Sequence, residues 1–150
     1  MLPEGAHYRL WQGYGNQDIA PIARAVDRFQ LGQMFRIDHL ERGLSRLLDQ
    51  DQVPSASRIE TILEYSRAHE LAMVEAQADR ALGLAHRNVE ALNRSFNAFN
   101  RIGAVPYAAR VRCERALLTG DHGEMQAGLA VLERFGDAEQ ILRFERLQVG

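Results

Sequence analysis

The sequence predicts an all-α protein, and three observations lead to that fold class. Apolar residues recur at steps of three and four along most of the chain, and glycines fall just past the ends of these periodic runs. No run of four to eight residues alternates as a strand would. With 150 residues and 46% hydrophobic composition, the chain has the size and make-up of one globular domain. We therefore expect a single helical domain over residues 1–150.

The first half of the chain carries the less regular helix signals. Irregular helix pairs are expected over about 5–67, including helices at about 33–49 and 57–67 that are joined by a long connection. Ser57 and Glu60 have the spacing of a capping box, which predicts that the second of these helices begins at Ser57. The first carries its apolar residues on one face: Met34, Ile37, Leu40, Leu44, Leu47 and Leu48.

The second half contains two clearer repeats, at about 69–103 and 104–136, followed by a last helix at about 138–148. The first helices of the two repeats align at an offset of 35, which makes Arg80 equivalent to Arg115. The turn between the two helices is then longer in the first repeat than in the second. Four apolar positions recur at a constant offset of 33: Leu92, Phe96, Phe99 and Ile102 against Met125, Leu129, Leu132 and Phe135. Such a period, with two helices per unit, is typical of helical solenoids. We therefore expect antiparallel helix pairs stacked as a short, right-handed, tetratricopeptide-like α-solenoid of about 8–9 helices.

Capping residues agree with this division into helices. Asp121 with Glu124, and Asp137 with Gln140, have the spacing that predicts helix starts. Helix ends are predicted where glycine follows a periodic run, at Gly32, Gly103, Gly120 and Gly136.

Part of the second half resembles a known family. Residues 72–84 read AMVEAQADRALGL, and residues 93–121 read NRSFNAFNRIGAVPYAARVRCERALLTGD. Over about 66–145 the chain is similar to the tetratricopeptide-like repeats in the C-terminal regions of large bacterial LuxR-type ATP-binding regulators and their nucleotide-cyclase relatives. In those repeats a phrase like F-x-R-I-G-A-x-P-x-x-A-R joins successive units, and residues 99–110 match it. The resemblance implies a regulatory, protein-interacting region, and no catalytic residue of that family maps onto this chain.

Composition excludes several function classes. The net charge of −2 argues against a general binder of nucleic acid or anionic membranes. All 18 basic residues are Arg, so the Lys that a P-loop, a protein kinase or a Schiff-base enzyme needs is missing. We see no apolar run of membrane-spanning length and no secretory signal, and therefore expect a cytoplasmic protein.

The sequence offers no convincing catalytic or metal-binding motif. His69-Glu70 begins like a zincin helix, but Met73 stands where the second His must be. The five histidines include no pair three or four residues apart, so we expect neither a metal nor a cofactor. The single cysteine, Cys113, falls on an apolar stripe, and we expect it to be buried as a small hydrophobic residue.

The strongest binding candidates are arginines on the first helix of each repeat. In a solenoid of this type these helices line the surface that partners use. The arginines could line a groove that accepts an acidic segment or a C-terminal carboxylate by bidentate contacts. Alternatively, Glu75, Asp79 and Glu114 pair with them along the helix surface. The candidate residues are Arg80, Arg110, Arg112 and Arg115.

Two functions of different classes follow, with a third as a remote alternative. The first is a non-catalytic interaction or regulatory module for a protein or peptide partner, within a bacterial transcriptional or signalling regulator. The second is a structural or oligomerisation domain, in which the last helix meets another copy through Ile141, Phe144 and Leu147. The third is an enzyme on a helical scaffold. No direct contact with nucleic acid or membrane is expected.

Overall fold

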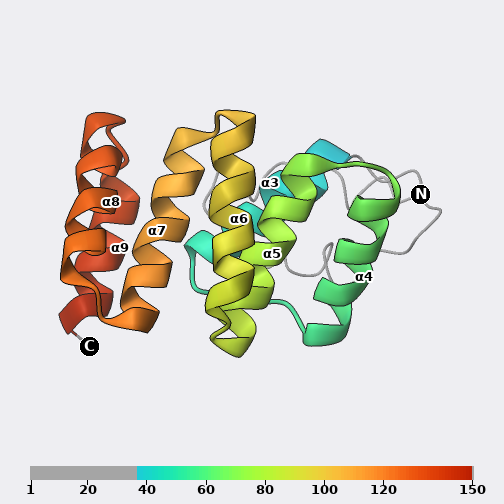
Figure 1. The fold of residues 1–150 in the computed structure, drawn as a ribbon, viewed down its shortest axis with the longest axis horizontal. Helices are drawn as coiled ribbons and strands as arrows, with labels where there is room; N and C mark the ends of the chain where they lie inside the picture. Colours follow the sequence, from blue (N-terminus) through green and yellow to red (C-terminus); the bar gives the residue numbers. More distant parts are fainter. Residues whose placement is uncertain (1–36, 150) are drawn as a thin grey trace, which may run out of the picture.

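The computed structural model describes residues 37–149, which form seven α-helices and no strand (Figure 1). The all-α fold class is thereby confirmed for this part of the chain. The helix pairs expected over about 5–67 lie partly before residue 37 and to that extent fall outside the described residues. The helices are α3 (Ile37–Asp49), α4 (Ala56–Ala68), α5 (Ala72–His86), α6 (Val89–Ile102), α7 (Val105–Thr119), α8 (His122–Arg134) and α9 (Ala138–Val149).

From α4 to α9 the helices stand side by side in chain order (Figure 1). Only two or three residues separate each helix from the next. Connections this short place each helix antiparallel to the one before it. Apolar side chains fill the spaces between successive helices, in clusters shared by α3, α4 and α5, by α5, α6 and α7, and by α7, α8 and α9.

The helix boundaries correct the expected offset of 35. Helices α5 and α7 begin at Ala72 and Val105, and the starts of α6 and α8 are separated by the same interval. Asn88 and Asp121 occupy the equivalent N-cap positions, where each side chain accepts a hydrogen bond from a backbone N–H three residues later. Both preceding turns contain two residues, so neither is longer. With this offset of 33, Arg80 does not correspond to Arg115. The equivalent N-caps determine how the two repeats align, whereas the offset of 35 depended on similar side chains in α5 and α7.

Three predicted helix ends are confirmed, the fourth, at Gly32, lies outside the described residues, and one predicted start is wrong. Gly103, Gly120 and Gly136 all have positive φ, the left-handed conformation that ends a helix. Helix α4 begins at Ala56 and not at Ser57, since Ser55 is in an extended conformation and its hydroxyl accepts from the N–H of Arg58 at 3.3 Å. A serine two residues earlier therefore caps this helix.

Helix α3 lies apart from the sequence of stacked helices. It runs behind α5 and α6 in Figure 1 and packs against α5, and it does not form a hairpin with α4. Six residues separate α3 from α4, twice the longest of the other connections. The expected pairing of helices 33–49 and 57–67 is therefore not what the structure shows, because the long connection lets α3 cross to the other side of α5.

Candidate functional site

The most unusual side chain of the described region is Arg80 on α5, which is completely buried. Its Nε and Nη2 donate to the two carboxylate oxygens of Glu114 at 2.7 and 2.9 Å, a bidentate pair. Nη2 also donates to Asp49 at 2.8 Å, and Nη1 to the amide oxygen of Gln77 at 3.4 Å. Burial alone lowers the pKa of Arg80, but the charges of Glu114 and Asp49 outweigh it and raise that pKa above its ordinary value. The guanidinium is therefore charged inside the protein.

Two further arginines extend this cluster onto the next helices. Arg110 on α7 donates to Asp49 at 2.7 Å and to Asp137 at 2.9 Å. Arg143 on α9 lies 3.0 Å from Glu114 and 2.8 Å from Asp51. We call Arg80, Arg110 and Arg143 the arginine face; they bring α5, α7 and α9 together around shared carboxylates.

Two of the four carboxylates that meet the arginine face come from the end of α3, and the others are Glu114 and Asp137. Asp49 is the last residue of that helix and Asp51 follows it in the turn. Asp49 is shared between Arg80 and Arg110, and Asp51 contacts Arg143 together with the exposed Arg146. We call Asp49 and Asp51 the acidic end of α3. This segment closes an ion-pair network with three helices that are distant from it in the sequence.

The rest of α3 is held by apolar contacts. Its leucines pack with α4 and α5 in one cluster and are at most 2% exposed. Beside them, Gln77 donates to the carboxylate of Glu41 at 3.1 Å. Burial raises the pKa of Glu41, and no arginine lies within ion-pair distance of it among the described residues. The leucines involved are Leu40, Leu44, Leu47 and Leu48.

The four arginines predicted from the sequence divide into two groups. Arg80 and Arg110 belong to the arginine face, but the burial of Arg80 removes it from contact with any added partner in this conformation. Arg112 and Arg115 lie on the other side of α7, where both pair with Glu124 on α8. Arg115 also stacks over the ring of Phe96 and donates to Asn93 at 3.0 Å. A helix turns through about 100° per residue, so neighbouring arginines on α7 face different helices.

The acidic residues named as alternative partners are paired, but only Glu114 pairs with one of the four candidate arginines. Glu114 pairs with Arg80 across two helices, and not along the surface of its own helix. Asp79 lies within 4 Å of both Arg67 and Arg94, and Glu75 lies 2.9 Å from Arg67.

The last helix turns its predicted contact residues inward. Phe144 is fully buried, and Ile141 and Leu147 pack around the same cluster between α7, α8 and α9. Leu142 and Val149 face solvent instead, with exposed fractions of 64% and 91%. An intermolecular contact through α9 would therefore use these two side chains.

Sequence reasoning missed the residues that complete the site. Asp49, Asp51 and Arg143 were not singled out, and α3 was expected to pair with α4. One signal was present: Leu-Leu-Asp-Gln-Asp at 47–51 places two carboxylates at a helix C-terminus, where the helix dipole disfavours negative charge. An acidic helix end of this kind points to cations elsewhere in the fold.

The described region contains one cysteine, and its thiol is not activated. Cys113 is buried, as expected, and burial raises the pKa of its thiol to about 12, which leaves it protonated at neutral pH. Among residues 37–149, no group of three or more His, Cys, Asp or Glu side chains could hold a metal ion.

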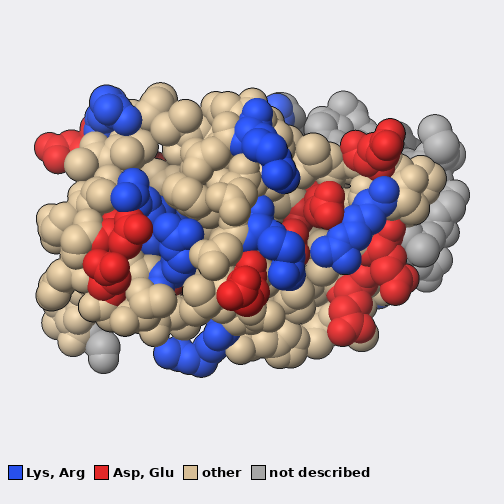
Figure 2. Space-filling view, viewed as in Figure 1, with Lys and Arg blue, Asp and Glu red and all other residues tan. Residues whose placement is uncertain are grey.

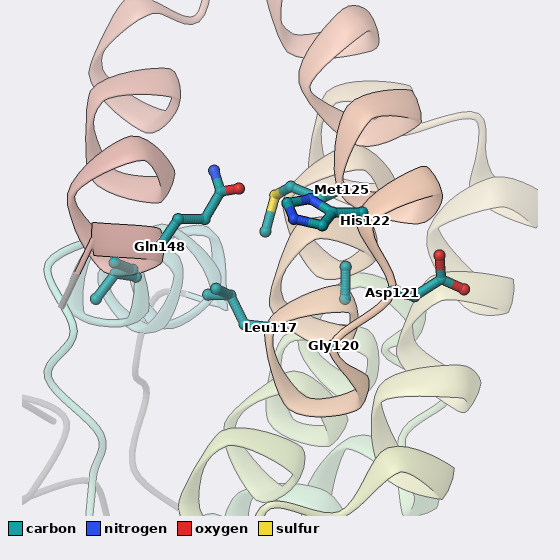
Figure 3. Close-up of a pocket in the computed structure, with 8 residues that line it drawn as sticks. Leu117, Gly120, Asp121, His122, Met125 and Gln148 are labelled. Atoms are coloured by element: carbon teal, nitrogen blue, oxygen red, sulfur yellow. The ribbon is translucent and has the colours of Figure 1, made fainter.

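A cavity of about 290 Å³ opens between the ends of α7, α8 and α9 (Figure 3). Leu117 and Met125 contribute apolar surface, and His122 and Gln148 border it, while the carboxylate of Asp121 points away. This volume is at the lower limit of small-molecule sites, and no charged group points into it. We therefore place the candidate site at the arginine face.

The outer face of the molecule shows no comparable concentration of charge. In Figure 2, arginine and acidic side chains are interspersed across the face that α4, α6 and α8 present.

None of the described helices is long and apolar enough to cross a membrane. Comparisons with protein-family models, with curated proteins and with solved structures find no match to this chain.

Proposed function

We propose that this protein is a non-catalytic interaction and regulatory module, built as a short, right-handed, tetratricopeptide-like α-solenoid. The equal spacing of helix starts and N-caps in α5–α6 and α7–α8 supports the repeat architecture. In such an array the first helices of successive units form one continuous surface for partners. Helices α5, α7 and α9 occupy those positions here.

The observation that carries the proposal is that this surface already holds a helix. The arginine face and the apolar surface of α5 together bind α3, an amphipathic segment of the same chain. A surface that buries leucines and pairs two carboxylates has the chemistry of helix recognition. The resemblance to LuxR-type regulators supports a regulatory role within a bacterial transcriptional or signalling protein.

Selection of helical peptides from a displayed library tests the proposed function. We expect a selected peptide to bind the whole chain saturably at one site and to slow amide exchange in α5, α7 and α9. Arg110→Ala should weaken binding at least tenfold with an unchanged far-UV spectrum, whereas Arg134→Ala, a matched change at an exposed arginine of α8, should not. Arg80→Ala is a poor test because removal of a buried charge destabilises the fold. Absence of any saturable binder would contradict the interaction role.

A second candidate function is self-association through α9, favoured by the exposure of Leu142 and Val149. Light scattering across a dilution series distinguishes the two: a stable dimer that Leu142→Glu converts to a 16.9 kDa monomer would favour a structural role. A charged residue at Phe144 is no substitute, because that side chain is buried and the change would unfold the helix packing.

A further inference from the structure

We infer that the arginine face is a binding site for a partner helix whose leucine stripe ends in two carboxylates, and that α3 is the intramolecular occupant which that partner replaces. This inference rests on the proposed function and adds the chemistry of the partner and the means of competition. It is carried by how α3 is connected, by the charge it brings, and by what its removal would leave.

The connection of α3 is that of a tethered ligand. Six residues, 50–55, join it to α4, and most of them are exposed. Helix α3 shares an apolar cluster with α4 and α5 but forms no hairpin with α4, and its polar contacts are made with α5, α7 and α9. Consecutive helices from α4 to α9 contact one another directly, and release of α3 would uncover the apolar residues of α4 and α5 that its leucines now cover.

The acidic end is locally unfavourable and is stabilised by contacts made at long range. Asp49 lies at the C-terminus of α3, where the dipole disfavours negative charge. Asp51 adopts a φ of 59°, a left-handed conformation that non-glycine residues rarely take. Arg46, in the last turn of the same helix, pairs with Glu139 instead. The compensation comes from the arginine face, whose members follow their aspartate partners by 31, 61 and 92 residues.

Removal of α3 would leave the arginine face short of negative charge. Among the described residues, its three guanidinium groups would then share only Glu114 and Asp137. A buried cation without its partner is strongly disfavoured, so whatever replaces α3 must bring carboxylates. It must also cover the apolar surface of α4 and α5 that the leucines now cover, which requires an amphipathic helix and not merely a soluble anion.

The positions of the arginines show how the site is built. Arg110 and Arg143 each stand at the sixth position of their helix, α7 and α9, and the same place on α5 is Gln77. Arg80 stands one helical turn beyond Gln77 and hydrogen-bonds to it. One carboxylate of a bound helix, in the position of Asp49, can therefore reach two arginines at once, and the next reaches the third.

The test separates α3 from the rest of the chain without removing it. A protease recognition sequence is inserted between Val53 and Pro54 in the full-length protein and then cut. A fluorescent peptide of residues 37–52 serves as the probe, and the same peptide carrying Asp49→Asn and Asp51→Asn is the matched control. Fluorescence anisotropy measures binding to cut and uncut chains, with far-UV circular dichroism as a check on folding.

We expect saturable binding of the acidic peptide to the cut chain, and at least tenfold weaker binding of the amide peptide. The uncut chain should bind the acidic peptide at least tenfold more weakly than the cut chain, since its tethered α3 competes at high effective concentration. The inference is overturned if the cut chain is folded but does not bind the acidic peptide, or if it binds both peptides equally.

A second variant covers the case in which the cut chain unfolds. The intact protein carrying Asp49→Asn and Asp51→Asn keeps its connection but holds α3 less tightly. It should bind the acidic peptide at least tenfold more tightly than the wild-type chain does, and equal binding overturns the inference. If library peptides still bind at another surface, the interaction role stands while the assignment of α3 fails.

Discussion

Replacing Glu114 by glutamine is the sharpest test of the buried ion-pair network. Glu114 is 1% exposed and accepts hydrogen bonds from Arg80 at 2.7 and 2.9 Å and from Arg143 at 3.0 Å. Glutamine has nearly the same shape, but it removes the charge and turns one acceptor into a donor that faces guanidinium N–H groups. The substitution therefore changes electrostatics and hydrogen bonding while packing stays nearly constant.

The expected loss of stability depends on which ion pairs remain after Glu114 is replaced. Breaking a buried pair by removing one partner costs about 3–5 kcal/mol. Arg80 keeps Asp49 and Arg143 keeps Asp51, so the lower end, about 3 kcal/mol, applies to the free energy of unfolding. For a chain of this length each kcal/mol lowers the melting temperature by roughly 2–4 °C, so Glu114→Gln should lower it by about 6–12 °C.

The assay is urea and thermal unfolding followed by far-UV circular dichroism. Glu124→Gln is the matched control, since Glu124 also pairs with two arginines but is one-third exposed and should lose less than about 1 kcal/mol. Added salt should reduce the control's effect and leave that of Glu114→Gln nearly unchanged, because buried charges are poorly screened. Equal effects of the two substitutions would refute the conclusion that the network supports the fold.

Three further predictions concern other described residues. Gly128→Ala should destabilise by about 1–3 kcal/mol, because its Cβ would lie 2.5 Å from the sulfur of Cys113, whereas Gly123→Ala in the same helix has room and should be neutral or stabilising by chemical denaturation. Glu41→Gln should stabilise at pH 7: burial raises the pKa of Glu41, so the folded state binds the proton more tightly and stability falls as pH rises from about 4.5 through the folded pKa. Unfolding midpoints should be measured at pH 4 and pH 7 for both proteins. The loss of stability between these two pH values should be smaller in Glu41→Gln than in the wild type, and an equal loss would contradict the prediction. Because burial raises the pKa of Cys113 to about 12, iodoacetamide at pH 8 should modify it only in denaturant, and rapid labelling of the folded chain would contradict its burial.

Much of the fold could be predicted because helices are local. The helical period of apolar side chains and the capping residues located the helices from residue 37 onwards to within a few positions. Asp121 caps α8 as its spacing predicted. The errors arose where two local patterns competed: Ser55 and Ser57 both could cap α4, and the backbone conformation of Ser55 decided.

The candidate site could be predicted only in part. The sequence indicates the arginines on α5 and α7 as candidates. Its pairing of Arg80 with Arg115 depends on the similar residues around them, but Arg80 is fully buried whereas Arg115 stacks over the ring of Phe96. No local pattern points to Arg143, because its partners, Asp51 and Glu114, are 92 and 29 residues away in the chain. Ion pairs of this kind follow no sequence spacing, since they depend on how whole helices pack.

The sequence alone determined that residues 37–149 are helical, where most of these helices begin and end, and that one set of apolar positions recurs at a constant interval, because these properties depend on neighbours within a turn or two. Only the tertiary structure decided that α3 leaves its neighbour α4 and lies against α5, with its acidic end on the arginine face. The physical reason is that carboxylates at a helix C-terminus and buried guanidinium groups are each unfavourable alone and become stable only together. That mutual requirement, and not any local preference, places the occupant on the surface that we propose for partners.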